Sequence, residues 1–232
     1  MKFWAFLIIL FFAVPEINAS SIWNDMEFVQ KAYSTSETLK CDASIEYFEN
    51  YKSVKKDYSL SAYMLVFHDE YYSRMGTIEV VINAKEGLMI DNEGRYAQLT
   101  TKQKLLNKGD SNPITMKDLL ALMDSSKKSV DTAYVLSEKN DIRTYYLSFK
   151  NKEYYKYMYF SFNTKSGLIY SVEYFFKNTE LGDLSRLTVK YNTTFLLDAK
   201  DNELLSFSNY LKGSKPPKLT DKYKNFEFFI DN

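Results

Sequence analysis

Cys41 and His68 are the only cysteine and the only histidine among the 232 residues, and their types suit nucleophilic chemistry. A thiolate paired with an imidazolium is the nucleophile of cysteine hydrolases. If a strand over 39–51 folds back on a strand over 59–68 about Val54 and Lys55, Cys41 lies directly opposite His68. The favoured alternative is a buried thiol near a histidine at a strand end, because the register of this hairpin is not fixed by its sequence.

Other catalytic classes find little support. No G-x-S-x-G motif accompanies His68, so a serine hydrolase is excluded. One histidine and one cysteine are too few for a zinc site, and the acidic spacing of a calcium loop does not occur. We therefore predict a protein without enzymatic activity, metal or cofactor. Nucleic acid is not an expected partner, because 30 basic and 30 acidic residues give a formal charge of zero.

The first 19 residues predict a secretory signal peptide that is cleaved near Ala19. Lys2 gives the positive start, residues 3–14 form an uninterrupted apolar run, and Pro15 breaks the helix before the cleavage point. This run is shorter than the roughly 20 residues that cross a bilayer. Ser20 stands where a lipid-anchored protein would carry cysteine. We expect a soluble periplasmic or secreted protein whose residues 20–232 form one domain.

Periodicity divides this domain into many strands and few helices. The expected strands, which alternate apolar and polar residues, are 39–51, 59–68, 77–84, 88–91, 95–100, 132–138, 142–149, 154–162, 168–177, 187–197 and 225–230. Helices are expected after caps at Asn24 or Asp25, at Thr115 and at Asp201. The fold class is therefore mostly β with a few helices (α+β). A curved antiparallel sheet of about ten or eleven strands forms an unclosed half-barrel, with an N-terminal helix and a midchain lid helix.

The stretch 151–178 concentrates large apolar side chains, since fourteen of its residues are Phe, Tyr, Leu, Ile, Val or Met. A turn after Asn163 closes a hairpin with these expected pairs: Phe162 and Leu168, Phe160 and Tyr170, Met158 and Val172, Lys156 and Tyr174. One face of this hairpin is almost wholly apolar, and the other is rich in tyrosine and can meet water. The sheet then curls around its few helices and leaves either a sealed core or a lined cavity.

The order of elements resembles the periplasmic lipoprotein carriers and receptors of the LolA/LolB type. The motifs that carry this resemblance are Gly76–Val81, Gly87–Gly94, the Leu119-Leu120 helix, Thr144–Leu147 and the hairpin Asn163–Ile169. The resemblance implies an unclosed barrel with helices as a lid, whose concave apolar face receives acyl chains. Asn83-Ala84-Lys85 departs from the basic residue and proline that the carriers show between strands, so the arginine latch of the lid is not carried over.

The leading hypothesis is a non-catalytic exported carrier that accepts acyl chains or another hydrophobic group, lipoprotein-linked cargo included, on the inner face of the half-barrel. The expected ligand-binding residues are Met64, Val66, Met158, Phe160, Phe162, Tyr170, Val172 and Tyr174, with Leu119, Leu122 and Met123 on the lid. The alternative is a structural or assembly protein of the cell envelope that contacts protein partners through its tyrosine-rich face. An enzyme built on Cys41 and His68 is the third hypothesis. The composition is compatible with peripheral membrane contact, and a monomer is expected.

Overall fold

The structure is a computed structural model that describes residues 19–107, 129–150, 155–177, 184–213 and 216–231. The predicted signal peptide, apart from Ala19, and the predicted lid helix with Leu119, Leu122 and Met123 lie outside the described residues. Within the described ranges, no helix combines the length and the apolar character that a membrane span requires.

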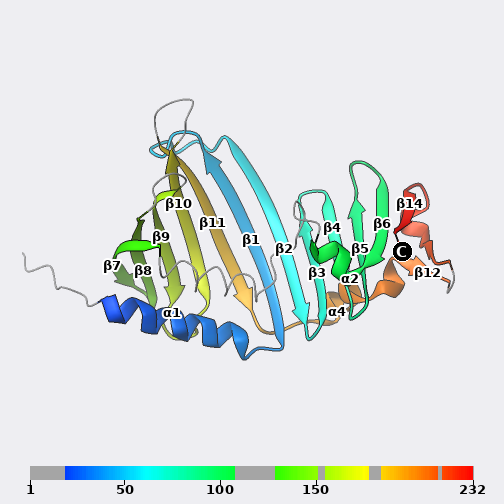
Figure 1. The fold of residues 1–232 in the computed structure, drawn as a ribbon, viewed down its shortest axis with the longest axis horizontal. Coiled ribbons are helices and arrows are strands. Elements are labelled where there is room, and N and C mark those ends of the chain that lie inside the picture. Colours follow the sequence, from blue (N-terminus) through cyan, green and yellow to red (C-terminus); the bar gives the residue numbers. More distant parts are fainter. Residues whose placement is uncertain (1–18, 108–128, 151–154, 178–183, 214–215, 232) are drawn as a thin grey trace, which may run out of the picture.

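The main element is one curved, unclosed sheet of twelve strands, which confirms the predicted fold class (Figure 1). Its spatial order is β14-β6-β5-β4-β3-β2-β1-β11-β10-β9-β8-β7. The strands are β1 (Thr38–Phe48), β2 (Tyr58–Phe67), β3 (Glu70–Met75), β4 (Ile78–Ile82), β5 (Glu86–Asp91), β6 (Tyr96–Thr101), β7 (Val130–Lys139), β8 (Ile142–Phe149), β9 (Tyr155–Asn163), β10 (Ile169–Lys177), β11 (Leu184–Thr194) and β14 (Glu227–Asp231). Neighbours pair antiparallel except β14, which pairs parallel to β6. The short strands β12 (Leu211–Lys212) and β13 (Lys218–Leu219) form a separate pair.

The N-terminal helix α1 (Ala19–Ser34) packs on the half of the sheet that contains β7 to β11. It starts at Ala19 and not at the predicted cap, and its buried stripe is Ile22, Met26, Val29 and Tyr33. These positions recur every three or four residues, so they share one face of the helix. Polar contacts fix the helix at both ends. Asp25 Oδ2 accepts bonds from Arg143 Nη1 at 2.5 Å and from the Tyr145 hydroxyl at 2.6 Å, and the Tyr33 hydroxyl accepts the Ile169 amide at 3.0 Å.

The two faces of the sheet have different covers. We call the face that packs against α1 the inner face. The short helix α2 (Lys102–Asn107) also lies on it, where Leu105 packs with Tyr71, Val80 and Ile82. The opposite, outer face is covered over β2 to β6 by the C-terminal cover, residues 197–213 and 216–226. This segment contains α4 (Ala199–Leu205) and the single turns η1 (Phe207–Asn209) and η2 (Asp221–Tyr223).

The strand pattern was predicted well, and the misses are short elements. Strand β3 was not expected, because its six residues lie between a turn at His68, where φ is 51°, and Gly76, where φ is 59°. Helix α2 was missed because it follows β6 without a break. The helical turn at Asp201 was expected correctly, but its N-cap is Asp198, and Asp201 is the third residue of the helix.

Candidate ligand-binding site

The predicted ligand-binding side chains divide by burial into a core and a rim. Phe160, Phe162 and Val172 are buried directly beneath α1, with exposed fractions of 4%, 0% and 6%. Met64, Val66, Met158 and Tyr174 are only half-buried and pack around that core. We call these seven side chains the inner wall. The first three fill the interior, and the last four form the part of the wall that a ligand could reach.

Met64 and Val66 connect two parts of the interior. Both pack against the cluster beneath α1, and both also pack against the cluster around Leu105 of α2. They lie two residues apart on β2, so they share the inner face of the sheet. The apolar surface is therefore continuous from one helix to the other, and its middle is half-buried.

Tyr170, which was predicted to face inward, has a side chain that is 53% exposed. The pairing of β9 with β10 shifts between Ile169 and Ser171, so Ile169 pairs with Phe162 and is buried instead. Beyond this bulge, Phe160 pairs with Val172 and Met158 with Tyr174, two positions from the expected register. A shift of two residues keeps the side chains on the same face, which is why Val172 and Tyr174 remain inward.

Four titratable side chains that surround the inner wall are uncharged at physiological pH. Burial raises the pKa of the Tyr33 hydroxyl, of the Cys41 thiol and of the Tyr191 hydroxyl, and it raises the pKa of Tyr71 to about 12. All four groups therefore stay protonated near pH 7. The inner wall and these four described side chains therefore form an uncharged surface, which suits an apolar group.

Cys41 and His68 do not form a pair. Cys41 lies opposite Met64, whereas the backbone amide of His68 bonds to Glu37 at the end of the hairpin. The pairing register of β1 with β2 differs from the predicted one by four residues. The connection between the strands is centred at residues 52 and 53 and not at Val54 and Lys55. The thiol is buried and accepts a bond from the Thr193 hydroxyl at 3.5 Å. Among the described residues, no three acidic, cysteine or histidine side chains are arranged to hold a metal ion.

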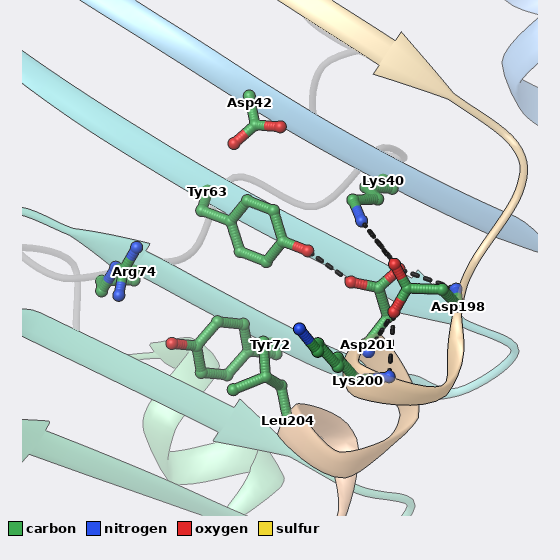
Figure 2. A pocket seen from close by; sticks show the side chains of 9 residues that line it. All are labelled: Lys40, Asp42, Tyr63, Tyr72, Arg74, Asp198, Lys200, Asp201 and Leu204. Carbon is green, nitrogen blue, oxygen red and sulfur yellow. Dashed lines mark hydrogen bonds and ion pairs between the residues drawn. The ribbon is translucent and has the colours of Figure 1, made fainter.

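A polar pocket of about 320 Å³ lies on the outer face, beside α4, and sequence reasoning missed it (Figure 2). Asp201, which is 2% exposed, is its central group. Its carboxylate accepts bonds from the Tyr63 hydroxyl at 2.5 Å, from Lys40 Nζ at 3.0 Å and from the Asp198 amide at 2.8 Å. Two features of the sequence could have pointed to this pocket. One is the Asp198-x-x-Asp201 capping box, and the other is Lys40 at an outward-facing position of its strand.

Charge and burial set the ionisation of this network. Burial alone would raise the pKa of Asp201, but the bonds from Tyr63, the Asp198 backbone and Lys40 outweigh it and lower the pKa. Burial and the bond to Asp201 raise the pKa of Tyr63 to about 12. The bond to Asp201 likewise raises the pKa of Lys40. At neutral pH the network is an ion pair with a neutral tyrosine, and its bonds tie β1 and β2 to the C-terminal cover.

The outer face of β7 to β10 carries a row of aromatic rings, the tyrosine row. Tyr134 stacks on Tyr146 at 4.9 Å, Tyr146 on Tyr157 at 5.4 Å and Tyr157 on Phe175 at 4.4 Å. Tyr134 is 39% exposed, while Tyr146 and Tyr157 are half-buried. The tyrosine-rich face expected from the hairpin therefore exists, with Tyr134 and Tyr146 added by the neighbouring strands.

No protein-family model matches this sequence, and no curated protein matches it. Similar solved structures include an uncharacterized conserved protein from Thermus thermophilus, with 12% identity and a TM-score of 0.44 over 91% of this chain and 99% of that chain. A LolA superfamily protein from Nitrosomonas europaea has 9% identity and a TM-score of 0.33 over 80% and 98%. The lipoprotein LppX of Mycobacterium tuberculosis has 8% identity and a TM-score of 0.39 over 75% and 94%. These likenesses concern the fold alone.

Proposed function

We propose that this protein is an exported, non-catalytic carrier or binding protein of the cell envelope that accepts acyl chains or another hydrophobic ligand on its inner wall. The observation that supports this most directly is the position of Met64 and Val66. Both side chains stay half-buried although they join the two clusters beneath α1 and α2. Burying a side chain of this size is worth about 1.5–3 kcal/mol, so a ligand that completes the burial gains binding energy.

The side chains of the rim suit a ligand of variable shape. Met64 and Met158 are unbranched and flexible, and methionine adapts to irregular apolar partners. Tyr174 adds a ring that contributes a large contact area. Because the wall carries no charge at neutral pH, we infer that the bound portion is a hydrocarbon, with any headgroup or lipoprotein chain left outside. The protein acts as a monomer in this proposal.

The test compares two methionines on neighbouring strands. Met64→Gln places an amide in the middle of the wall, whereas Met75→Gln makes the same change at a side chain that is 55% exposed. An unpaired amide against an apolar ligand costs about 1–3 kcal/mol, so we expect an environment-sensitive apolar dye to bind Met64→Gln roughly tenfold more weakly or worse. The Met75→Gln variant should bind the dye as the wild type does, and both variants should keep their thermal midpoint within a few degrees.

Mass spectrometry of lipid extracts from the purified wild-type protein gives the second measurement. We expect co-purified acyl species. A lipid-free protein that leaves the dye dark would refute the carrier function, and so would equal losses in the two variants.

The tyrosine row supports a second candidate, a structural or assembly role in the cell envelope. Tyrosine is enriched in protein interfaces because its ring gives contact area and its hydroxyl keeps a polar edge. The row lies on the face opposite to the inner wall and is half-exposed at Tyr134. Under this alternative the inner wall is only a core, and the dye and lipid measurements are both negative.

A further inference from the structure

The connection between β1 and β2, residues 49–57, forms a tip at the end of the sheet opposite to α1 (Figure 1). Val54 in this tip is 98% exposed, more than any other large hydrophobic side chain among the described residues. Tyr58, the first residue of β2, is 56% exposed beside it. Two apolar side chains are therefore presented to the surroundings at the end of the two strands.

The tip is a built structure that holds Val54 outward. Asn50 organises its first turn, because its side-chain oxygen accepts the Lys52 amide at 2.9 Å and its carbonyl accepts the Ser53 amide at 2.9 Å. The Ser53 carbonyl in turn accepts Nη2 of Arg186 at 3.2 Å, and this guanidinium lies 4.0 Å from the centre of the Phe48 ring. The backbone on the N-terminal side of Val54 is thus fixed to β11, so the exposure of the valine is imposed by the fold.

The charged residues that lie next to Val54 in the sequence are positive. Lys52, Lys55 and Lys56 flank it, and no acidic residue occurs between Asn50 and Lys56. Lys56 pairs with Glu46 of β1 at 2.8 Å, which leaves the ammonium half-exposed. The acidic residues Glu49 and Asp57 lie at the base of the tip, where the Asp57 carboxylate accepts the Glu49 amide at 2.8 Å. An exposed valine between lysines complements a surface that is anionic outside and apolar beneath.

An apolar track leads from the tip to the inner wall. Every second residue of β2 points to the inner face, and these residues are Tyr58, Leu60, Ala62, Met64 and Val66. Tyr58 is exposed and the other four are half-buried, so none is closed off in the core. At about 3.3 Å per residue, the track is roughly 26 Å long.

We propose that the tip docks on a lipid bilayer with anionic headgroups, so that an acyl chain can pass along β2 to the inner wall. Val54 enters the interface between headgroups and acyl chains, Tyr58 lies at the headgroup level, and the lysines contact the phosphates. The passage of the chain rests on the proposed carrier function, whereas docking of the tip does not require it.

The experiment is sedimentation of the full mature protein with vesicles. One set contains phosphatidylglycerol and phosphatidylcholine in equal parts, and the other contains phosphatidylcholine alone. We expect Val54→Ser to weaken partitioning into the anionic vesicles about fivefold. Lys55→Ser should weaken it by a similar factor on the anionic vesicles and should have little effect on the neutral ones, because each lysine near an anionic surface contributes a comparable amount.

Leu196→Ser is the matched control. Leu196 is 80% exposed, and it lies two residues after Thr194, which pairs with Lys40 at the end of β1 away from the tip. We expect this variant to bind the vesicles as the wild type does. If the wild-type protein stays in solution with both vesicle types, the docking is overturned. This is also the result expected if the tip binds a second copy of the protein or another protein. Equal losses in Val54→Ser and Leu196→Ser also overturn it.

The dye titration separates this inference from the carrier function. We expect Val54→Ser to bind the apolar dye with unchanged affinity, because the inner wall is intact. Wild-type protein that binds the dye but ignores anionic vesicles loses only the docking. A protein that docks through Val54 and leaves the dye dark keeps the docking and loses the carrier function.

Discussion

Asp201→Asn tests whether the polar network holds the C-terminal cover on the outer face. In the wild type the Oδ2 atom accepts Lys40 and the Asp198 amide, and the Oδ1 atom accepts the Tyr63 hydroxyl. An asparagine keeps the shape and one acceptor. In its best orientation the amide oxygen takes the Oδ2 site and the NH₂ group faces Tyr63. The Tyr63 hydroxyl must then rotate so that its oxygen accepts a hydrogen bond from the NH₂ group.

The magnitude follows from the loss of charge in three hydrogen bonds. A hydrogen bond to a charged group contributes about 1.5–3 kcal/mol and a neutral one about 0.5–1.5 kcal/mol, so each bond loses about 1 kcal/mol. The neutral amide is less costly to bury than the carboxylate, and Lys40 is 24% exposed, so the ion pair is partly screened. We expect a net loss of about 2 kcal/mol in the free energy of unfolding.

Urea denaturation at pH 7 gives this free energy, and Asp221→Asn is the matched control. Asp221 pairs with Lys212 at 2.6 Å, but its side chain is 90% exposed, so solvent screens the pair and the same substitution should leave the free energy of unfolding nearly unchanged. If Asp201→Asn lowers the free energy of unfolding no more than Asp221→Asn does, the cover is held without Asp201 and the reasoning is refuted.

The pH dependence provides a further check on Asp201. Because its pKa is lowered in the folded protein, its stabilising effect is complete above the unfolded value near 4 and disappears as pH falls through the folded value. The difference between the wild type and Asp201→Asn should therefore be full at pH 7 and should shrink below about pH 4. A difference that is unchanged at pH 2 would contradict the assigned contacts.

Two further predictions concern the inner face. Phe162→Ala should lower the free energy of unfolding by about 3–5 kcal/mol, because it empties a fully buried site. Tyr170→Ala on the paired strand should lower it by less than about 1 kcal/mol. Urea denaturation measures both free energies, and a large loss at Tyr170 would contradict the bulge. Cys41 should react with iodoacetamide at pH 8 about tenfold more slowly in the folded protein than in urea, because its thiol is buried and its pKa is raised. Mass spectrometry measures the two rates, and equal rates would contradict the buried position of the thiol.

Alternation in the sequence was sufficient to predict the strands, but not the pairing between them. The hairpin of β7 and β8 was expected at 132–138 and 142–149 and is found there, because Asn140 and Asp141 form a two-residue turn with positive φ angles of 52° and 62°. For β1 and β2 the nine-residue tip allowed several registers, and the predicted contact of Cys41 with His68 was wrong by four residues. The bulge after Ile169 could not be predicted, because neither Tyr170 nor its neighbours carry a sequence signal for it.

The polar pocket was missed for a related reason. Asp198 and Asp201 are sequence neighbours whose capping box is local and could be predicted. Their partners Lys40 and Tyr63 are more than a hundred residues away, and only the packing of α4 on β2 and β3 brings them together. Long-range contacts between a strand and a distant helix leave no periodic pattern in the sequence.

The burial of successive residues shows which strands are covered on both faces and which on one. In β4, Glu79, Val80, Val81 and Ile82 are all buried, and because neighbouring side chains point to opposite faces, this strand must be covered on both sides. Helix α2 covers its inner side and the C-terminal cover its outer side. In β1, by contrast, Leu39 and Cys41 are buried while Asp42 is exposed, so only the inner side needs a cover. The sheet changes from two-sided to one-sided packing at β2, where Met64 and Val66 lie half-buried between the two helices. A hydrophobic ligand placed there would complete the inner layer, because the chain itself already fills the outer layer at that strand.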